Sequence, residues 1–138
     1  MASIDEVAAA FFEACETGGG WDGCAQYCTD DATFSAQSET IGDITDLRTY
    51  ADWMKGTLAL MPDATYDLKA FAADPERNCV LAYAVFRGTH TGEGGPVPPT
   101  GNSVSSDYVY AMQFDGNKIS HLTKVWHSAD AATQLGWT

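Results

Sequence analysis

Basic side chains are scarce in this sequence, with 7 Lys and Arg against 19 Asp and Glu and a formal net charge of −12. That charge would repel a phosphate backbone, so we expect no nucleic acid partner. For the same reason we expect no binding to an anionic membrane surface. No run approaches the roughly 20 apolar residues of a membrane-spanning helix. The first residues are acidic and lack the basic start of a secretory signal, which leaves a cytoplasmic location as the expectation.

Histidine and cysteine are also few, at 3 and 4 residues. Cys24 and Cys28 are four residues apart, which would put them on one face of a helix. A metal site needs further ligands at suitable spacing, and none stands nearby, so we expect no metal and free, buried thiols. Phosphate-binding loops, dinucleotide motifs and nucleophile elbows are missing as well, and we expect no cofactor.

Apolar residues make up 45% of the 138, enough for one domain with its own core. Helices are expected at residues 3–17, 21–28, 45–61 and 128–135, and strands at 32–36, 65–72, 79–90, 103–114 and 118–127. Asp30 and Asp31 are expected in a turn or cap before the first strand, and the Gly- and Pro-rich segment 91–101 in a loop. Ser128 is expected to cap the last helix in place of its neighbour His127.

Helices followed by a run of antiparallel strands predict an α+β domain that covers residues 1–138. We expect a cone-shaped, strongly curved, mostly antiparallel sheet with the N-terminal helices packed on its concave side. The mouth of such a cone is a natural site for a small molecule.

Four short motifs at the ends of the expected strands and of the last helix carry a family resemblance. They are Gly88-Thr89-His90-Thr91-Gly92, Pro98-Pro99-Thr100-Gly101, Phe114-Asp115-Gly116-Asn117-Lys118-Ile119 and Gln134-Leu135-Gly136. In this order they resemble the SnoaL-like polyketide cyclase family, which has the nuclear-transport-factor-two-like or ketosteroid-isomerase-like cone fold. The resemblance implies a cystatin-like α+β architecture, a deep pocket between the curled sheet and the helices, and a homodimer.

The resemblance also implies an activity, because characterised family enzymes include cofactor-free aldol cyclases of aromatic polyketide pathways. In those enzymes a pocket Asp acts as general acid and base, and a pocket His helps to polarise the substrate. Counting back from Gln134 places the acid near Lys124 and the His near Tyr110, and no Asp or Glu lies from Ile119 to His127. The pattern predicts the pocket, while the residues at its two catalytic positions differ from those of the family.

Lys124 is the least usual candidate residue, because it shares strand parity with Leu122 and Trp126. An outward, solvated side chain is the ordinary outcome for a lysine, and it is the orientation that we expect. An inward side chain would lose its water, which would lower its pKa and make it a base or an imine-forming amine.

Tyr110 and His90 are the other candidate catalytic residues. The Tyr110 side chain is expected to face the cone interior, where its hydroxyl could donate to a substrate carbonyl. His90 ends a strand beside the Gly-rich loop, where it could act as a base or simply anchor the loop. Only one of Tyr83 and Phe86 can line the cavity, because they face opposite ways. The expected substrate-binding residues are Tyr50, Trp53, Tyr83, Tyr108, Met112 and Trp126.

Three functions remain open on this fold. The first is a cofactor-free enzyme that transfers protons on a small apolar or aromatic carbonyl compound, as an aldol cyclase, isomerase or dehydratase. The second is a non-catalytic binding protein for a small apolar ligand. The third is a structural dimer module with a vestigial pocket, and one fold can serve all three.

Overall fold

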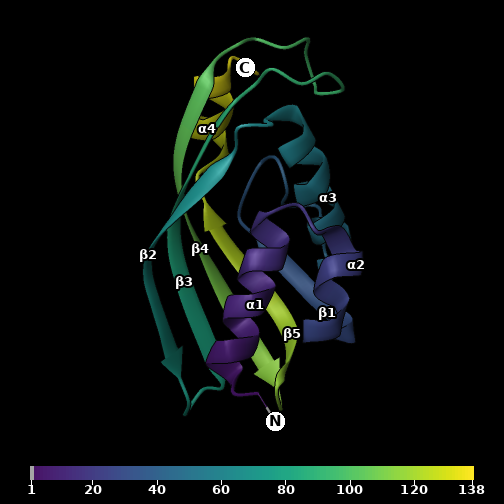
Figure 1. Cartoon of the computed structure of the whole chain (residues 1–138), viewed down its shortest axis with the longest axis vertical. Coiled ribbons are helices and arrows are strands. Elements are labelled where there is room, and N and C mark those ends of the chain that lie inside the picture. The colour runs from purple at the N-terminus through teal and green to yellow at the C-terminus, as the bar shows by residue number, and fades with distance from the viewer. Residues whose placement is uncertain (1) are drawn as a thin grey trace.

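Five strands form one sheet in the order β1-β5-β4-β3-β2 in this computed structural model, which describes residues 2–138 (Figure 1). The strands are β1 (Cys28–Ala36), β2 (Thr65–Asp74), β3 (Cys79–Thr89), β4 (Ser103–Asp115) and β5 (Lys118–Trp126). The helices are α1 (Ile4–Glu16), α2 (Gly20–Cys24), α3 (Leu47–Leu60) and α4 (Ser128–Leu135), with a short 3₁₀ helix at Ala25–Tyr27. No helix in these described residues is both long and apolar enough to cross a membrane.

The sheet is curved and open, and most of the helices are gathered on one side of it. β1 pairs in parallel with β5, and the other neighbouring strands pair antiparallel. In Figure 1, α1, α2 and α3 lie across one face of the sheet, while α4 follows β5 at the end that carries the C-terminus. Register shifts at Leu68/Ala70 in β2 and at Gln113/Phe114 in β4 help the long strands to bend. The predicted α+β class and the curved, mostly antiparallel sheet are confirmed.

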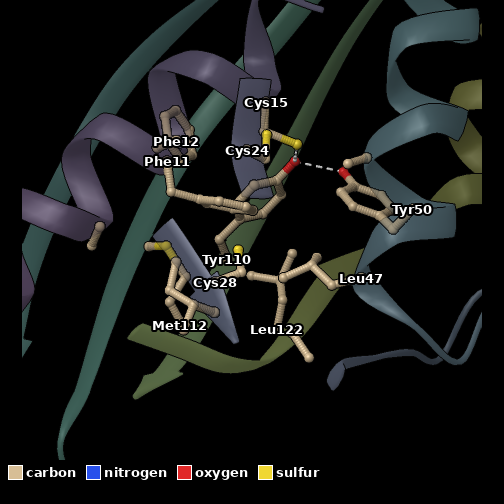
Figure 2. Close-up of a cluster of buried hydrophobic side chains, with 14 of the residues drawn as sticks. Phe11, Phe12, Cys15, Cys24, Cys28, Leu47, Tyr50, Tyr110, Met112 and Leu122 are labelled. Carbon is tan, nitrogen blue, oxygen red and sulfur yellow. Dashed lines mark hydrogen bonds between the residues drawn. The ribbon is translucent and has the colours of Figure 1, made fainter. Parts of the chain in front are cut away.

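The inner face of β4 forms the centre of the core. Its inward side chains are those of Tyr108, Tyr110, Met112 and Phe114, and all four are buried, as the alternation predicted. Ala82 of β3 lies opposite Tyr110 in the register, so the small side chain leaves room for the large ring. Phe11 and Phe12 of α1 close over Tyr110, with ring centroids 6.4 and 5.1 Å away (Figure 2). Each such buried ring stabilises the fold by about 1.5–3 kcal/mol.

The segment after α1 differs from its prediction. The helix α2 ends at Cys24, and a 3₁₀ turn leads to Cys28, which already belongs to β1. Asp30 and Asp31 therefore lie inside β1 with exposed side chains, and the turn predicted for them is wrong. The pairing of β1 with β5 shifts between Cys28 and Thr33. Because of this irregularity at the sheet edge, the first half of β1 lacks the regular apolar alternation by which a strand is predicted.

The residue that caps α4 is His127, and the prediction of Ser128 is wrong. Nδ1 of His127 accepts a hydrogen bond from the amide of Asp130 at 3.0 Å. Ser128 is instead the first residue of the helix, and its buried hydroxyl accepts a hydrogen bond from Ser38 at 2.7 Å. The side chain of Ser128 is thus turned toward the segment after β1.

The loop between β3 and β4 is fastened to the end of α3 by its backbone. The amides of Thr91 and Gly92 both donate to the carbonyl of Leu60, at 3.2 and 2.9 Å. A side chain at Gly92 would begin 2.4 Å from the carbonyl oxygen of Ala59, so only glycine fits there. This contact holds the end of β3 beside α3, at the end of the molecule that carries the C-terminus (Figure 1).

Candidate functional site

A narrow apolar cavity lies between α3, α4 and the inner faces of β3, β4 and β5. Its volume is about 40 Å³. Its walls include Trp53, Met61, Phe86, Tyr108, Trp126 and Leu135. One carboxyl side chain, that of Glu16, and one amine, that of Lys124, also reach it.

Lys124 faces this cavity and is only 6% exposed, so the predicted outward orientation is wrong. The residue lies directly opposite Tyr110 in the β4–β5 register and shares the inner face of the sheet with it. Its nitrogen lies 4.4 Å from the ring centroid of Trp126 and 5.2 to 5.9 Å from those of Tyr50, Trp53, Tyr108 and Tyr110. We call these five rings the aromatic box. Their negative faces attract the ammonium group and offset part of the cost of removing it from water.

Glu16, at the end of α1, is a buried acid that was not among the predicted site residues. It is 5% exposed. The hydroxyl of Tyr108 donates to its Oε1, and the hydroxyl of Tyr110 donates to its Oε2 at 2.5 Å. A signal for it existed, because Glu16 follows Phe12 by four residues and therefore lies on the same buried ridge of the helix. The family resemblance implied an acid near position 124, whereas the folded chain brings the carboxyl group of Glu16 to the site from its first helix.

Two tyrosine hydroxyls connect Lys124 to Glu16. Nζ of Lys124 donates to the hydroxyl of Tyr50 at 3.0 Å. The hydroxyl oxygens of Tyr50 and Tyr110 point at one another and are 2.5 Å apart (Figure 2). Tyr110 has a single hydroxyl hydrogen and gives it to Glu16, so Tyr50 is the donor in its contact with Tyr110. Every donor thus points from the amine toward the carboxylate, and we call Lys124, Tyr50, Tyr110 and Glu16 the proton chain.

Burial shifts both ends of the proton chain toward their uncharged forms. It lowers the pKa of Lys124 to about 8, against the attraction of the Glu16 carboxylate. It raises the pKa of Glu16, against the charge of Lys124 and the hydrogen bonds from Tyr108 and Tyr110. Burial also raises the pKa of the Tyr50 and Tyr110 hydroxyls, which stay protonated and able to donate. An acid and an amine shifted in this way on one dry cavity are suited to proton transfer near neutral pH.

The predicted binding residues are divided between the cavity and the core behind it. Trp53, Tyr108 and Trp126 line the cavity. Tyr50 is fully buried behind its wall and meets the site through its hydrogen bond with Lys124. Met112 is fully buried in the core and does not reach the cavity.

Tyr83 lies on the outer face of the sheet with 37% of its surface exposed, so its position does not fit a ligand in this cavity. Phe86 lines the cavity in its place, as the opposite parity of the two residues allows. In the register Tyr83 lies opposite Val109, and Val109 lies opposite Val125. A row of three apolar side chains therefore crosses the outer face.

His90 anchors the β3–β4 loop and does not line the cavity. Its fully buried ring accepts at Nδ1 from Nε1 of Trp137 at 3.0 Å and from the amide of Thr100 at 3.4 Å. Because Nδ1 accepts, Nε2 carries the hydrogen, and it has no partner among residues 2–138. Trp137 does line the cavity, so His90 acts on the site through that ring. Of the two interpretations of His90, the geometry supports the loop anchor.

Comparison with known families identifies the fold and its relatives. A family profile described as SnoaL-like polyketide cyclase matches residues 6–135. The chain belongs to the SnoaL-like polyketide cyclase family. The resemblance seen in four short motifs thus extends over nearly the whole chain. No curated protein matches it.

Solved structures with the SnoaL-like fold superpose on most of this chain. AclR from Streptomyces galilaeus, provisionally described as a hydroxylase, has a TM-score of 0.78 and 20% identity, over 98% of this chain and 82% of its own. IdmH from Streptomyces antibioticus, provisionally described as a polyketide cyclase, has a TM-score of 0.76 and 22% identity, over 98% of this chain and 99% of its own. A protein from Jannaschia sp. CCS1, provisionally described as a SnoaL-like polyketide cyclase, has a TM-score of 0.79 and 13% identity, over 98% of this chain and 92% of its own. At these identities the likeness shows the shared fold.

In this SnoaL-like chain, an amine and a carboxyl group reach one apolar cavity. The motif count implied an acid near position 124, and that position holds the amine of Lys124. A carboxyl group reaches the cavity from Glu16, at the end of α1. The cavity therefore contains both an acid and a base, contributed by the opposite ends of the chain.

Proposed function

We propose that this SnoaL-like protein is a cofactor-free enzyme that transfers protons on a small, flat, polyketide-like carbonyl compound. The observation that carries the proposal is the presence of Glu16 and Lys124 on one apolar cavity, joined by the proton chain. Proton transfer beside a carbonyl needs a base, a donor for the developing oxyanion and the exclusion of water. Aldol cyclisation, isomerisation and dehydration of such compounds all draw on this step.

In this proposal Glu16 is the general base and Lys124 the donor to the carbonyl. A carboxylate whose pKa is raised accepts a proton from carbon more readily than an ordinary one. The ammonium group of Lys124 would donate to the carbonyl oxygen and stabilise the enolate as its charge develops. Tyr108 is a positioning residue, because its hydroxyl fixes the orientation of the carboxylate.

The dimensions of the cavity favour a flat and narrow ligand. Its volume of about 40 Å³ is far below the roughly 300–1,000 Å³ of pockets for drug-sized ligands. The rings of Trp53 and Trp126 form part of its walls, with centroids 6.1 Å apart. A ligand larger than one ring would extend past Thr40, which is the exposed residue of the lining. We therefore expect substrates in which one aromatic or cyclic ketone unit enters the cavity first.

A non-catalytic binding protein for a small apolar ligand is the second candidate. It is favoured by the contacts that the Lys124 ammonium group already makes without a ligand. The group donates to the Tyr50 hydroxyl and lies against the ring faces of the aromatic box. This function predicts tight binding without turnover. A dimer module with a vestigial pocket predicts neither binding nor turnover.

Exchange of deuterium from solvent into the carbon beside the carbonyl of small aryl ketones tests the proposal, with NMR as the readout. We expect the unaltered protein to accelerate exchange, and Glu16→Gln to lose on the order of 100-fold of that rate. Glu76→Gln, in the exposed turn after β2, is the matched control and should exchange at the unaltered rate. Binding without exchange on every compound would favour the binding protein. Full activity in Glu16→Gln would remove the assigned base.

A further inference from the structure

The nitrogen of Lys124 can be more than a charged donor, because an unprotonated amine is a nucleophile toward carbonyl carbon. We propose that Lys124 forms an imine with small apolar aldehydes and ketones that enter the cavity. The inference rests on the proposed function in one respect, since it requires the carbonyl group of the ligand to lie at Lys124. It goes further, because proton transfer alone needs no covalent bond.

The contacts of Nζ leave it free to react. Its hydrogen-bond partner is the hydroxyl of Tyr50, and its remaining surroundings are the rings of the aromatic box. The ion pairs formed by residues 2–138 are those of Lys69 with Asp67 and Arg77 with Asp74, so no carboxylate is in direct contact with Lys124. Once the amine has lost a proton, no neighbouring carboxyl group of the described residues accepts a hydrogen bond from it or donates one to its lone pair.

The proton chain supplies a route for that proton. Lys124 donates to Tyr50, Tyr50 to Tyr110, and Tyr110 to Glu16. When each hydroxyl passes its own hydrogen forward and accepts the one behind it, Lys124 becomes a neutral amine and Glu16 a carboxylic acid. Burial favours this uncharged pair, since it lowers the pKa of Lys124 and raises that of Glu16.

The reaction balances with no outside reagent. The neutral nitrogen bonds to the carbonyl carbon, the π pair moves to oxygen, and one proton passes from nitrogen to that oxygen to give a carbinolamine. Glu16, which lines the same cavity, gives its proton to the hydroxyl group, and the C–O bond breaks with loss of water. The nitrogen lone pair then forms the C=N bond of the iminium ion. In sum, an ammonium group and a carbonyl compound give an iminium ion and water.

The aromatic box suits the product as well as the starting amine. The ammonium group and the iminium ion carry the same single positive charge at the same nitrogen. The ring faces that attract the first therefore attract the second. The apolar walls also draw an apolar carbonyl compound out of water.

The other lysines provide an internal comparison. Lys55, Lys69 and Lys118 are exposed. Near neutral pH, an amine with a pKa near 8 has a neutral fraction on the order of 100-fold larger than that of the lysine of a model peptide, whose pKa is about 10.4. Preferential reaction at Lys124 is therefore expected even though it is the most buried of the four.

Benzaldehyde with sodium cyanoborohydride, at about pH 7, tests the inference. Hydride from the cyanoborohydride adds to the iminium carbon and leaves a stable benzylamine, which peptide mapping by mass spectrometry assigns to a residue. We expect the rate of benzylation at Lys124 to exceed that at Lys55 by a factor on the order of 10 or more. The α-amino group of the chain, whose ordinary pKa is near 8, is the reference for an amine of similar basicity. Labelling of Lys124 no faster than that of Lys55 would overturn the inference.

Two variants separate reaction in the cavity from general reactivity. Thr57→Phe places a ring among the lining side chains of α3, and we expect it to slow labelling of Lys124 on the order of 10-fold while the α-amino group reacts as before. Lys124→Arg keeps a cation in the aromatic box, and its thermal unfolding shows whether the fold is intact. Unchanged Lys124 labelling in a folded Thr57→Phe variant would overturn the role of the cavity.

The two proposals fail in different ways. Trapping at Lys124 without deuterium exchange on any ketone would support the imine and count against the enzyme. Exchange that survives in Lys124→Arg, with no trapping in the unaltered protein, would support proton transfer and overturn the imine. Trapping together with loss of exchange in Lys124→Arg is the result that we expect.

Discussion

Glu16 at the end of α1 and Tyr110 in the middle of β4 are joined by a 2.5 Å hydrogen bond from hydroxyl to carboxylate, although 94 residues separate them. The bond connects the first helix to the centre of the sheet. Through Tyr50 it also connects both elements to Lys124. The stability, ionisation and chemistry of the protein should all depend on this connection.

Burial of Lys124 makes stability depend on pH in a defined direction. Its pKa is about 8 in the folded chain against an ordinary 10.5, so in this interval the unfolded chain holds more protons and stability rises with pH. Relative to Lys124→Met, the free energy of unfolding of the unaltered protein should rise by about 1–2 kcal/mol between about pH 8 and 9.5. Urea titrations of both proteins at the two pH values measure this difference. A difference that stays constant with pH would mean that Lys124 is solvated.

Removal of the Tyr110 hydroxyl should destabilise the fold. Tyr110→Phe takes one donor from Glu16 and the acceptor from the Tyr50 hydroxyl, all of them buried. A cost of about 1–3 kcal/mol is expected, because buried polar groups lose a partner. Tyr83→Phe, on the outer face, makes the same chemical change and should stay within about 0.5 kcal/mol. Equal effects of the two substitutions in chemical denaturation would show that the proton chain contributes nothing to stability.

His90→Ala distinguishes the loop anchor from a catalytic base. The substitution removes the acceptor for Trp137 and Thr100, so we expect a loss of about 1–3 kcal/mol in stability. Because Trp137 lines the cavity, KM for deuterium exchange should rise while kcat stays close to the unaltered value. A fall in kcat on the order of 100-fold without a change in stability would instead make His90 a catalytic residue.

The row of Tyr83, Val109 and Val125 across the outer face is where we propose that a second copy of the chain binds, in keeping with the homodimer implied by the family resemblance. Val125 is 60% exposed, so a charge there should not disturb the core. Val125→Glu is expected to shift sedimentation from dimer to monomer, because like charges would be buried at the interface. Sedimentation of the unaltered protein as a monomer would contradict the proposal.

Most of the fold could be predicted because its strands obey simple patterns. β4 alternates buried and more exposed side chains along its whole length, and the Asp115-Gly116 turn separates it from β5. β1 could not be found in full, since its first half is polar and its pairing with β5 is irregular. Asp30 and Asp31 are of a residue type common in turns, yet they belong to the strand that continues to Ala36.

The aromatic residues that line the site could be predicted from the sequence, but the positions of its two charged groups, Lys124 and Glu16, could not. Strand parity predicted that Tyr108 and Tyr110 share the inner face of β4, and both are buried there. Whether Lys124 turns inward depends on rings from α3, β4 and β5 that only the folded chain brings together. Glu16 depends likewise on how α1 lies across the sheet, which periodicity along a single helix does not specify.

The ionisation of Lys124 is the most direct measurement of the proton chain. The chemical shift of its ¹³Cε, followed by NMR as pH changes, reports the pKa of the amine. We predict a midpoint near 8 in the unaltered protein and a lower one in Glu16→Gln, because the carboxylate charge holds the pKa of Lys124 up. A midpoint close to the ordinary 10.5, unchanged in Glu16→Gln, would contradict both the burial of the amine and its coupling to Glu16.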